Sequence, residues 1–111
     1  MTERMRRVNE ALREVIASTI AGDLEDPRIG FVTVTSVETS PDLRSARVFV
    51  SVLGDEQERE RTLAALQSSH GPIQSAIASQ MRLKRTPTLR FHYDEGPERG
   101  VRLSQLLEDD E

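Results

Sequence analysis

The chain lacks several features that would narrow its chemistry. It contains no cysteine and no tryptophan, and its aromatic residues are three phenylalanines and one tyrosine. Without cysteine it can form no disulfide, thiolate metal site or cysteine nucleophile, and nothing indicates a secreted, oxidising setting. Its 111 residues, 36% of them hydrophobic, suffice for one domain with a small aliphatic core.

A long hydrophobic run is also missing. The first twenty residues carry Arg4, Arg6, Arg7 and Arg13 within an amphipathic pattern, without the continuous apolar segment of a signal peptide or a membrane span. We therefore expect a cytoplasmic protein that has no membrane partner.

Catalytic motifs are absent too. The six glycines form neither a dinucleotide fingerprint nor a phosphate-binding loop. His70 and His92 have no ligand at the short spacing that a metal site requires. Ser68 and Ser69 directly precede His70, but adjacent side chains point apart and cannot form the hydrogen bond that activates a serine nucleophile. The sequence therefore predicts no enzyme, no metal site and no cofactor.

Acidic residues are missing from one segment. Between Arg61 and Tyr93 there is no Asp or Glu, although the whole chain has 19 acids and a net charge of −4. The same segment carries five positive charges, at Arg61, Arg82, Lys84, Arg85 and Arg90. Because the local field decides where a polyanion docks, this segment suits an anionic partner in spite of the total charge. The alternative is that the acid-free run arose by chance.

The first half of the chain shows a helix and a hairpin. Apolar residues recur at spacings of three and four from Thr2 to Ala21, which predicts an amphipathic helix capped by Thr2 and stopped by Gly22. Residues 31–37 and 46–53 are rich in β-branched residues and are joined by the turn at 40–42, which predicts two paired strands.

The second half predicts two helices and a third strand. An acid-rich turn from Asp55 opens the first helix, and Gly71-Pro72 breaks it. A second helix should begin with Pro72 at its first position, where proline is tolerated best, and end at Thr86-Pro87. Residues 89–93 alternate as a strand.

This order, α-β-β-α-kink-α-β, predicts an α+β fold with a small mixed sheet and helices on one face. The other face has no predicted cover, so its polar side chains are free to meet solvent or a partner. We expect a domain over residues 1–95, followed over 96–111 by a short C-terminal helix and an acidic tail.

Two stretches of this domain are candidates for binding phosphate. The corner Ser69-His70-Gly71 would present backbone N–H groups at the start of a helix, where the helix dipole favours an anion. The alternative is that His70 is only a polar residue at a helix end. Arg82, Lys84 and Arg85, placed at the far end of the second helix, either match the dipole there or form a phosphate-binding patch with Arg90 on the next strand. We favour the patch because three cations fall within four residues.

Arg6 and Arg7 are further candidates near the N-terminus, together with Arg4. Glu3 and Glu10 lie close in sequence and could pair with them. The sequence leaves their direct role in binding open.

Several separated blocks resemble the ribosome-binding factor A family of bacteria. The first is Asp26-Pro27-Arg28-Ile29-Gly30-Phe31-Val32-Thr33-Val34-Thr35, continued through Val50-Ser51-Val52. The second is Leu83-Lys84-Arg85-Thr86-Pro87-Thr88-Leu89-Arg90-Phe91, and the third runs from Arg99-Gly100-Val101-Arg102 to Leu106-Leu107. These blocks occur in the family's order and cover nearly the whole chain.

The resemblance implies a K-homology-like domain of the second topological type that binds RNA. Ordinary K-homology domains hold single strands with a Gly-x-x-Gly loop, which is absent here. The family has an Ala-x-Gly kink between helices instead, and Ser69-His70-Gly71 lies at that position with serine in place of alanine.

The function implied is assembly rather than catalysis. Members bind the small (30S) ribosomal subunit and its 16S rRNA during late maturation, support processing of the 5′ end of 16S rRNA, and matter for growth in the cold. A ribosome-associated GTPase is a candidate releasing partner, and we expect a monomer. The alternatives are a generic single-stranded nucleic-acid-binding protein of K-homology type, and a protein interaction module that uses the uncovered face of the sheet.

Overall fold

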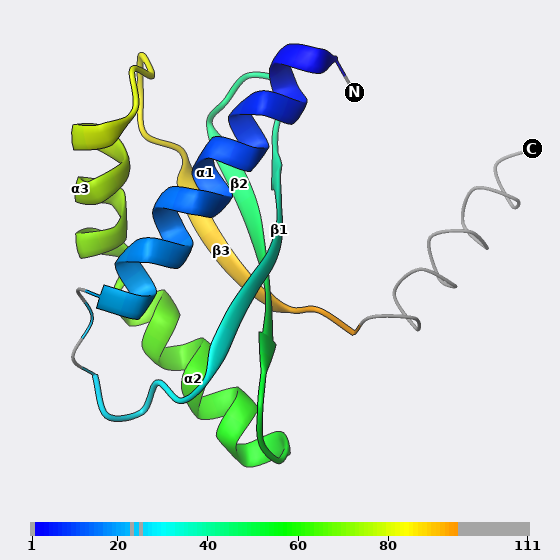
Figure 1. Cartoon of the computed structure of the whole chain (residues 1–111), viewed down its shortest axis with the longest axis vertical. Coiled ribbons are helices and arrows are strands. Elements are labelled where there is room, and N and C mark those ends of the chain that lie inside the picture. The colour runs from blue at the N-terminus through cyan, green and yellow to red at the C-terminus, as the bar shows by residue number, and fades with distance from the viewer. Residues whose placement is uncertain (1, 23, 25, 96–111) are drawn as a thin grey trace, which may run out of the picture.

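The computed structural model describes residues 2–22, 24 and 26–95, and confirms the predicted order of elements (Figure 1). The bounds are α1 Glu3–Gly22, β1 Val32–Thr39, β2 Ser45–Val52, α2 Glu56–Ser68, α3 His70–Gln80 and β3 Thr88–Tyr93. The predicted C-terminal helix and acidic tail, residues 96–111, lie outside the described residues. None of the helices described is long and apolar enough to cross a membrane.

The three strands form one mixed sheet in the order β1-β2-β3, with β1 antiparallel and β3 parallel to β2. Alternate strand residues are buried beneath the helices, while their neighbours are exposed on the other face. This confirms the α+β class, with the three described helices on one face of the sheet. The fully buried side chains of the core come from all three helices and from β2 and β3, and include Leu12, Ile16, Leu66, Ile73, Ile77, Val48, Val50 and Leu89.

A β-bulge at Thr35 keeps β1 in phase with the core. The register moves from Val34 opposite Val50 to Ser36 opposite Phe49, so Thr35 has no partner residue in the ladder. Val34 and Val37 are an odd number of residues apart, and strict alternation would place them on opposite faces. The extra residue reverses the phase, and both valines are buried.

The outer edge of β3 is covered by a glutamine rather than left open. The Gln67 amide donates to the carbonyl of Leu89 at 3.1 Å and accepts from the N–H of Phe91 at 3.3 Å. Exposed edges invite pairing with other strands, so this side chain both satisfies and blocks the edge.

The break between the helices is not where the sequence predicted it. α2 ends at Ser68 and α3 begins at His70, so the junction residue is Ser69 and Pro72 is the third residue of α3 rather than the first. The proline costs nothing there, because the first four N–H groups of a helix have no partner within it.

The end of α3 was also predicted wrongly. The helix stops at Gln80, and Met81 is already extended, with φ −121° and ψ 147°. Arg82, Lys84 and Arg85 therefore belong to the loop before β3 and not to the last turn of a helix. Leu83 packs against the core from within this loop, and Pro87 is fully buried at its end, which explains why the chain leaves the helix early.

The strands of the hairpin differ slightly from their predicted bounds: β1 spans 32–39 rather than 31–37, and β2 spans 45–52 rather than 46–53. Phe31 and Leu53 thus lie just outside the strands, and their side chains are 81% and 75% exposed, so they contribute little to the core.

Core packing predicts a clear contrast between two leucines. Leu12→Ala should lower the free energy of unfolding by about 2–5 kcal/mol, because a fully buried side chain leaves a cavity, while Leu53→Ala should change it by less than about 0.5 kcal/mol. Urea unfolding followed by circular dichroism measures both. Equal losses for the two variants would contradict the packing described.

Candidate nucleic-acid interface

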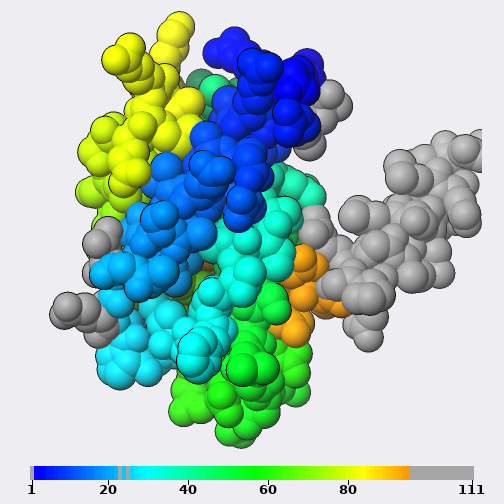
Figure 2. Space-filling view, in the orientation of Figure 1, coloured from blue at the N-terminus to red at the C-terminus, as the bar shows by residue number. Residues whose placement is uncertain are grey.

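Three segments that are far apart in sequence meet at one end of the molecule and form a groove of about 540 Å³. They are the start of α1, the turn between β1 and β2, and the loop between α3 and β3, which gather at the top of Figures 1 and 2. We call this the basic groove; it is lined by Arg4, Asp42, Leu43, Arg44, Arg82, Leu83, Lys84 and Arg85.

The backbone fixes these segments beside one another. The N–H of Thr88 donates to the carbonyl of Arg44 at 2.9 Å, which ties the start of β3 to the hairpin turn. The side chain of Asn9, buried on α1, accepts from the N–H of Thr39 at 3.1 Å and holds the first half of α1 against the end of β1. These hydrogen bonds tie the start of β3 to the hairpin turn and α1 to the end of β1, so the three segments are held side by side.

The turn itself is held by its own polar residues. The Ser40 hydroxyl donates to Asp42 at 2.7 Å, the N–H of Arg44 donates to the same carboxylate at 3.0 Å, and Leu43 has a positive φ of 61°. These hydrogen bonds, first that of Ser40 and then that of Arg44, lower the pKa of Asp42 below its usual value. The carboxylate stays ionised, and it is occupied by its own turn.

Charge in the basic groove is strongly unbalanced. Five cationic side chains line it together with a single carboxylate, Asp42. The nearest ion pair, between Arg44 and Asp42, is 3.8 Å long and exposed, so it holds the arginine weakly. Within the part of the chain that the structure describes, Arg4, Arg82, Lys84 and Arg85 form no ion pair. Such a groove can bind a phosphate backbone, since arginine and lysine side chains hydrogen-bond to phosphate oxygens and release the counter-ions that surround the nucleic acid.

Arg44 was not among the residues predicted to bind, and the role of Arg4 was left open. Arg44 lies far from the acid-free segment, so the charge pattern could not reveal it. The predicted topology could have identified it. A third strand parallel to β2 must begin at the end of the sheet where the hairpin turn lies, so the residues that precede the two strands are neighbours.

The corner Ser69-His70-Gly71 lies at the other end of α3 from the groove (Figure 1). The N–H of Ser69 donates to the carbonyls of Ala65 and Leu66, so it closes α2 and is not available to a ligand. The His70 ring contacts the carbonyl of Gln67 through Nδ1 at 2.8 Å. Pro72 supplies no N–H, which leaves those of His70 and Gly71. Phosphate binding at this corner stays a prediction, separate from the groove.

Arg6 and Arg7 are engaged locally. Arg6 pairs with Glu3 at 2.6 Å and Arg7 with the same carboxylate at 3.3 Å, all on the exposed side of α1. The Arg6 hydrogen bond lowers the pKa of Glu3. Exposed pairs within a helix are weak, so their role in binding also stays a prediction.

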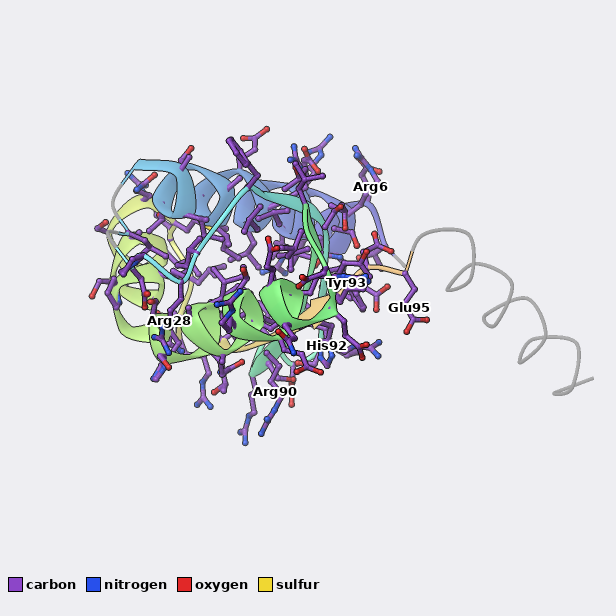
Figure 3. The ribbon with its side chains drawn as sticks, turned by 90° about the horizontal axis from the view of Figure 1, so that it is seen from below. Arg6, Arg28, Arg90, His92, Tyr93 and Glu95 are labelled. Carbon is purple, nitrogen blue, oxygen red and sulfur yellow. The ribbon has the colours of Figure 1, made fainter. Side chains whose placement is uncertain are left out.

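Arg90 is not part of the basic groove. It lies in the middle of β3 on the open face of the sheet, beside Arg47 of β2, and points away from α1 (Figure 3). The predicted set of binding residues is thus divided by the fold into the loop cations, the helix corner, the start of α1 and the open face.

Comparison with known proteins gives one consistent result. Residues 4–107 match the family model of ribosome-binding factor A. Ribosome-binding factor A of Halothermothrix orenii is 45% identical over 105 residues, covering 95% of this chain and 86% of that protein. The protein of the same name from Rhodopirellula baltica is 45% identical over 106 residues, covering 96% and 77%.

Solved structures agree with this. The crystal structure of ribosome-binding factor A from Thermus thermophilus superposes with a TM-score of 0.73 at 30% identity, covering 80% of this chain and 93% of that one. The solution structure of a putative ribosome-binding factor A from Thermotoga maritima gives 0.76 at 35% identity, covering 86% and 92%. A homology model of the Thermus thermophilus protein, fitted into a cryo-EM map of its complex with the 30S subunit, gives 0.65 at 30% identity, covering 79% and 92%.

The groove predicts a position-dependent affinity for polyanions. Arg44→Ala should elute from a heparin column at lower salt than the wild type, because it removes one of the cations that converge there. Arg61→Ala removes the same charge from α2, beside Pro27, Arg28 and Leu53, and should elute nearly as the wild type does. Equal shifts would mean that net charge alone governs binding.

Proposed function

We propose that this chain, which belongs to the ribosome-binding factor A family, binds the small (30S) ribosomal subunit and contacts 16S rRNA through the basic groove. Its role is that of an assembly factor in late maturation of the subunit, including processing of the 5′ end of 16S rRNA. The protein acts by binding and carries out no catalysis itself.

The observation that carries the proposal is the convergence of five cations from three chain segments around one carboxylate. This arrangement gives an acidic protein a local field of the opposite sign, suited to a polyanion. The support from relatives is the complex of the Thermus thermophilus protein with the 30S subunit.

The geometry favours recognition of RNA shape over sequence. The groove offers charged side chains from three chain segments, and the two central helices meet at Ser69 without a Gly-x-x-Gly loop to clamp a single strand. Phosphate contacts position a protein on a nucleic acid and carry no sequence information directly. A folded rRNA surface is therefore a better partner than an unstructured oligonucleotide.

The remaining features of the proposed role are those expected from the sequence and its family resemblance. The protein acts as a monomer in the cytoplasm, supports growth in the cold, and leaves the subunit when maturation is complete. A ribosome-associated GTPase is the candidate for its release.

Co-sedimentation with immature and mature small subunits across a salt series tests the proposal. The wild type should prefer immature subunits, and its affinity should fall steeply with salt. Lys84→Ala/Arg85→Ala should bind about tenfold more weakly and lower the salt slope by about 2, because two phosphate contacts are lost.

Arg59→Ala/Arg61→Ala is the matched control, since it removes two charges from α2, where neither residue lines the groove. It should bind like the wild type. Unchanged sedimentation of the Lys84/Arg85 variant would remove the groove from the interface. Tight binding to short single strands, without binding to subunits, would favour a generic single-stranded nucleic-acid-binding protein.

A further inference from the structure

The open face of the sheet carries a group of cationic and aromatic side chains that the basic groove does not use. Arg47 of β2 and Arg90 of β3 are directly adjacent in the parallel ladder, and the next outward-facing pair along it is Phe49 and His92. The Phe49 ring lies beneath the side chains of His92 and Arg47. The ring centres of Phe49 and His92 are 5.6 Å apart, and the Arg47 guanidinium carbon is 6.0 Å from the centre of the Phe49 ring.

This packing positions the polar groups outward. Phe49 is only 8% exposed although none of the three described helices covers this face, because the side chains around it form its cover. Arg47 is held over the ring and also paired with Glu38 at 2.8 Å, so its direction is set from two sides. Arg90 and His92 are exposed beside it.

The charge on this part of the face is positive. Two arginines, Arg47 and Arg90, lie there beside one carboxylate, Glu38, which is paired with Arg47. A second carboxylate, Asp94, lies farther along β3 and accepts a hydrogen bond from Thr35 at 2.6 Å. Arg90 forms no ion pair among the residues described. The face therefore offers at least one free guanidinium to a ligand from outside, with an imidazole next to it.

The open face is also continuous with the basic groove. Ser45 and Thr88, the first residues of β2 and β3, are paired and exposed, and Arg44 of the groove directly precedes Ser45. Arg90 is two residues beyond Thr88 on the same strand and the same face. A polyanion seated in the groove reaches Arg90 by crossing one pair of small hydroxyl side chains.

We propose that the open face around Arg47, Arg90 and His92 is a second RNA-contacting surface, which takes the phosphate backbone of the strand that leaves the basic groove. The inference rests on the proposed function and extends it around the edge of the sheet to the side opposite the helices. The occupant is RNA rather than a protein strand, because the face is cationic and its exposed side chains are polar, while the edge of β3 is already closed by Gln67.

His92 makes this contact sensitive to pH. Its pKa lies below 6.5, first because of its partial burial and then because Arg47 and Arg90 repel its positive form, while Glu38 acts in the opposite direction. The ring is therefore neutral at pH 7.5. A bound phosphate favours the charged ring, so affinity for RNA should rise as the pH falls toward the pKa of His92, and His92→Gln should lose that part of the rise.

Because the chain has no cysteine, a single introduced one can carry a chemical probe. An iron chelate attached to Ser51→Cys, on the open face two residues beyond Phe49, should cleave 16S rRNA in the bound small subunit. The same chelate on Ser18→Cys, on the exposed side of α1, is the matched control for the helical layer. No rRNA cleavage from position 51, in a protein that still binds subunits, would overturn the proposal.

Substitution of Arg90 separates the two surfaces. Arg90→Ala should weaken subunit binding by about two- to fivefold and reduce the salt slope by about 1, whereas Arg61→Ala should do neither. If Lys84→Ala/Arg85→Ala weakens binding and Arg90→Ala does not, the open face is not a contact and the proposed function stands. If the wild type itself fails to bind subunits, the proposed function fails.

Discussion

The parallel pairing of β3 with β2 is the constraint on which the rest of this structure depends. Parallel strands cannot be joined by a tight turn, so the chain must cross from the end of β2 back to its beginning, and α2 and α3 provide that crossing. The same pairing makes both strands begin at the same end of the sheet. The residues before them, Arg44 and the loop from Arg82 to Arg85, are brought together for that reason alone.

Packing of the crossing helices determines how much of the sheet is available to a partner. Their buried residues, such as Leu66, Ile73 and Ile77, meet the inward-facing residues of β2 and β3, and α2 also extends Gln67 to the edge of β3. One face and one edge are closed by these contacts. Within residues 2–22, 24 and 26–95 no helix lies on the opposite face, and neighbouring side chains cover its aromatic centre at Phe49, so polar groups lie on its surface.

The distribution of charge follows the same geometry. Carboxylates at the start of α2 suit the positive end of the helix dipole, and Asp55 caps that helix through the N–H of Glu58 at 2.8 Å. The cations of the groove lie at the opposite end of the molecule, where the hairpin turn and the loop before β3 meet (Figure 1). A chain with a net charge of −4 can thus present a cationic end to RNA.

How much of this was predictable depends on the range of the interactions involved. Hydrophobic periodicity, turn residues and caps act over a few positions, and for that reason the order of the six elements, the cap at Thr2 and the α+β class could be predicted from the sequence. Local sterics also placed a break near Gly71-Pro72, but its position at Ser69 depends on how α2 and α3 both pack into the core. The early end of α3 was missed for the same reason, because it is set by the burial of Leu83 and Pro87.

The bulge at Thr35 arises because two valines separated by three positions must face the same core. Which cations lie together became evident only from the three-dimensional structure: Arg44 and Arg4 join the loop cations, while Arg90 lies on another face. The pairing of the strands, and not distance along the chain, determines which charges share a surface.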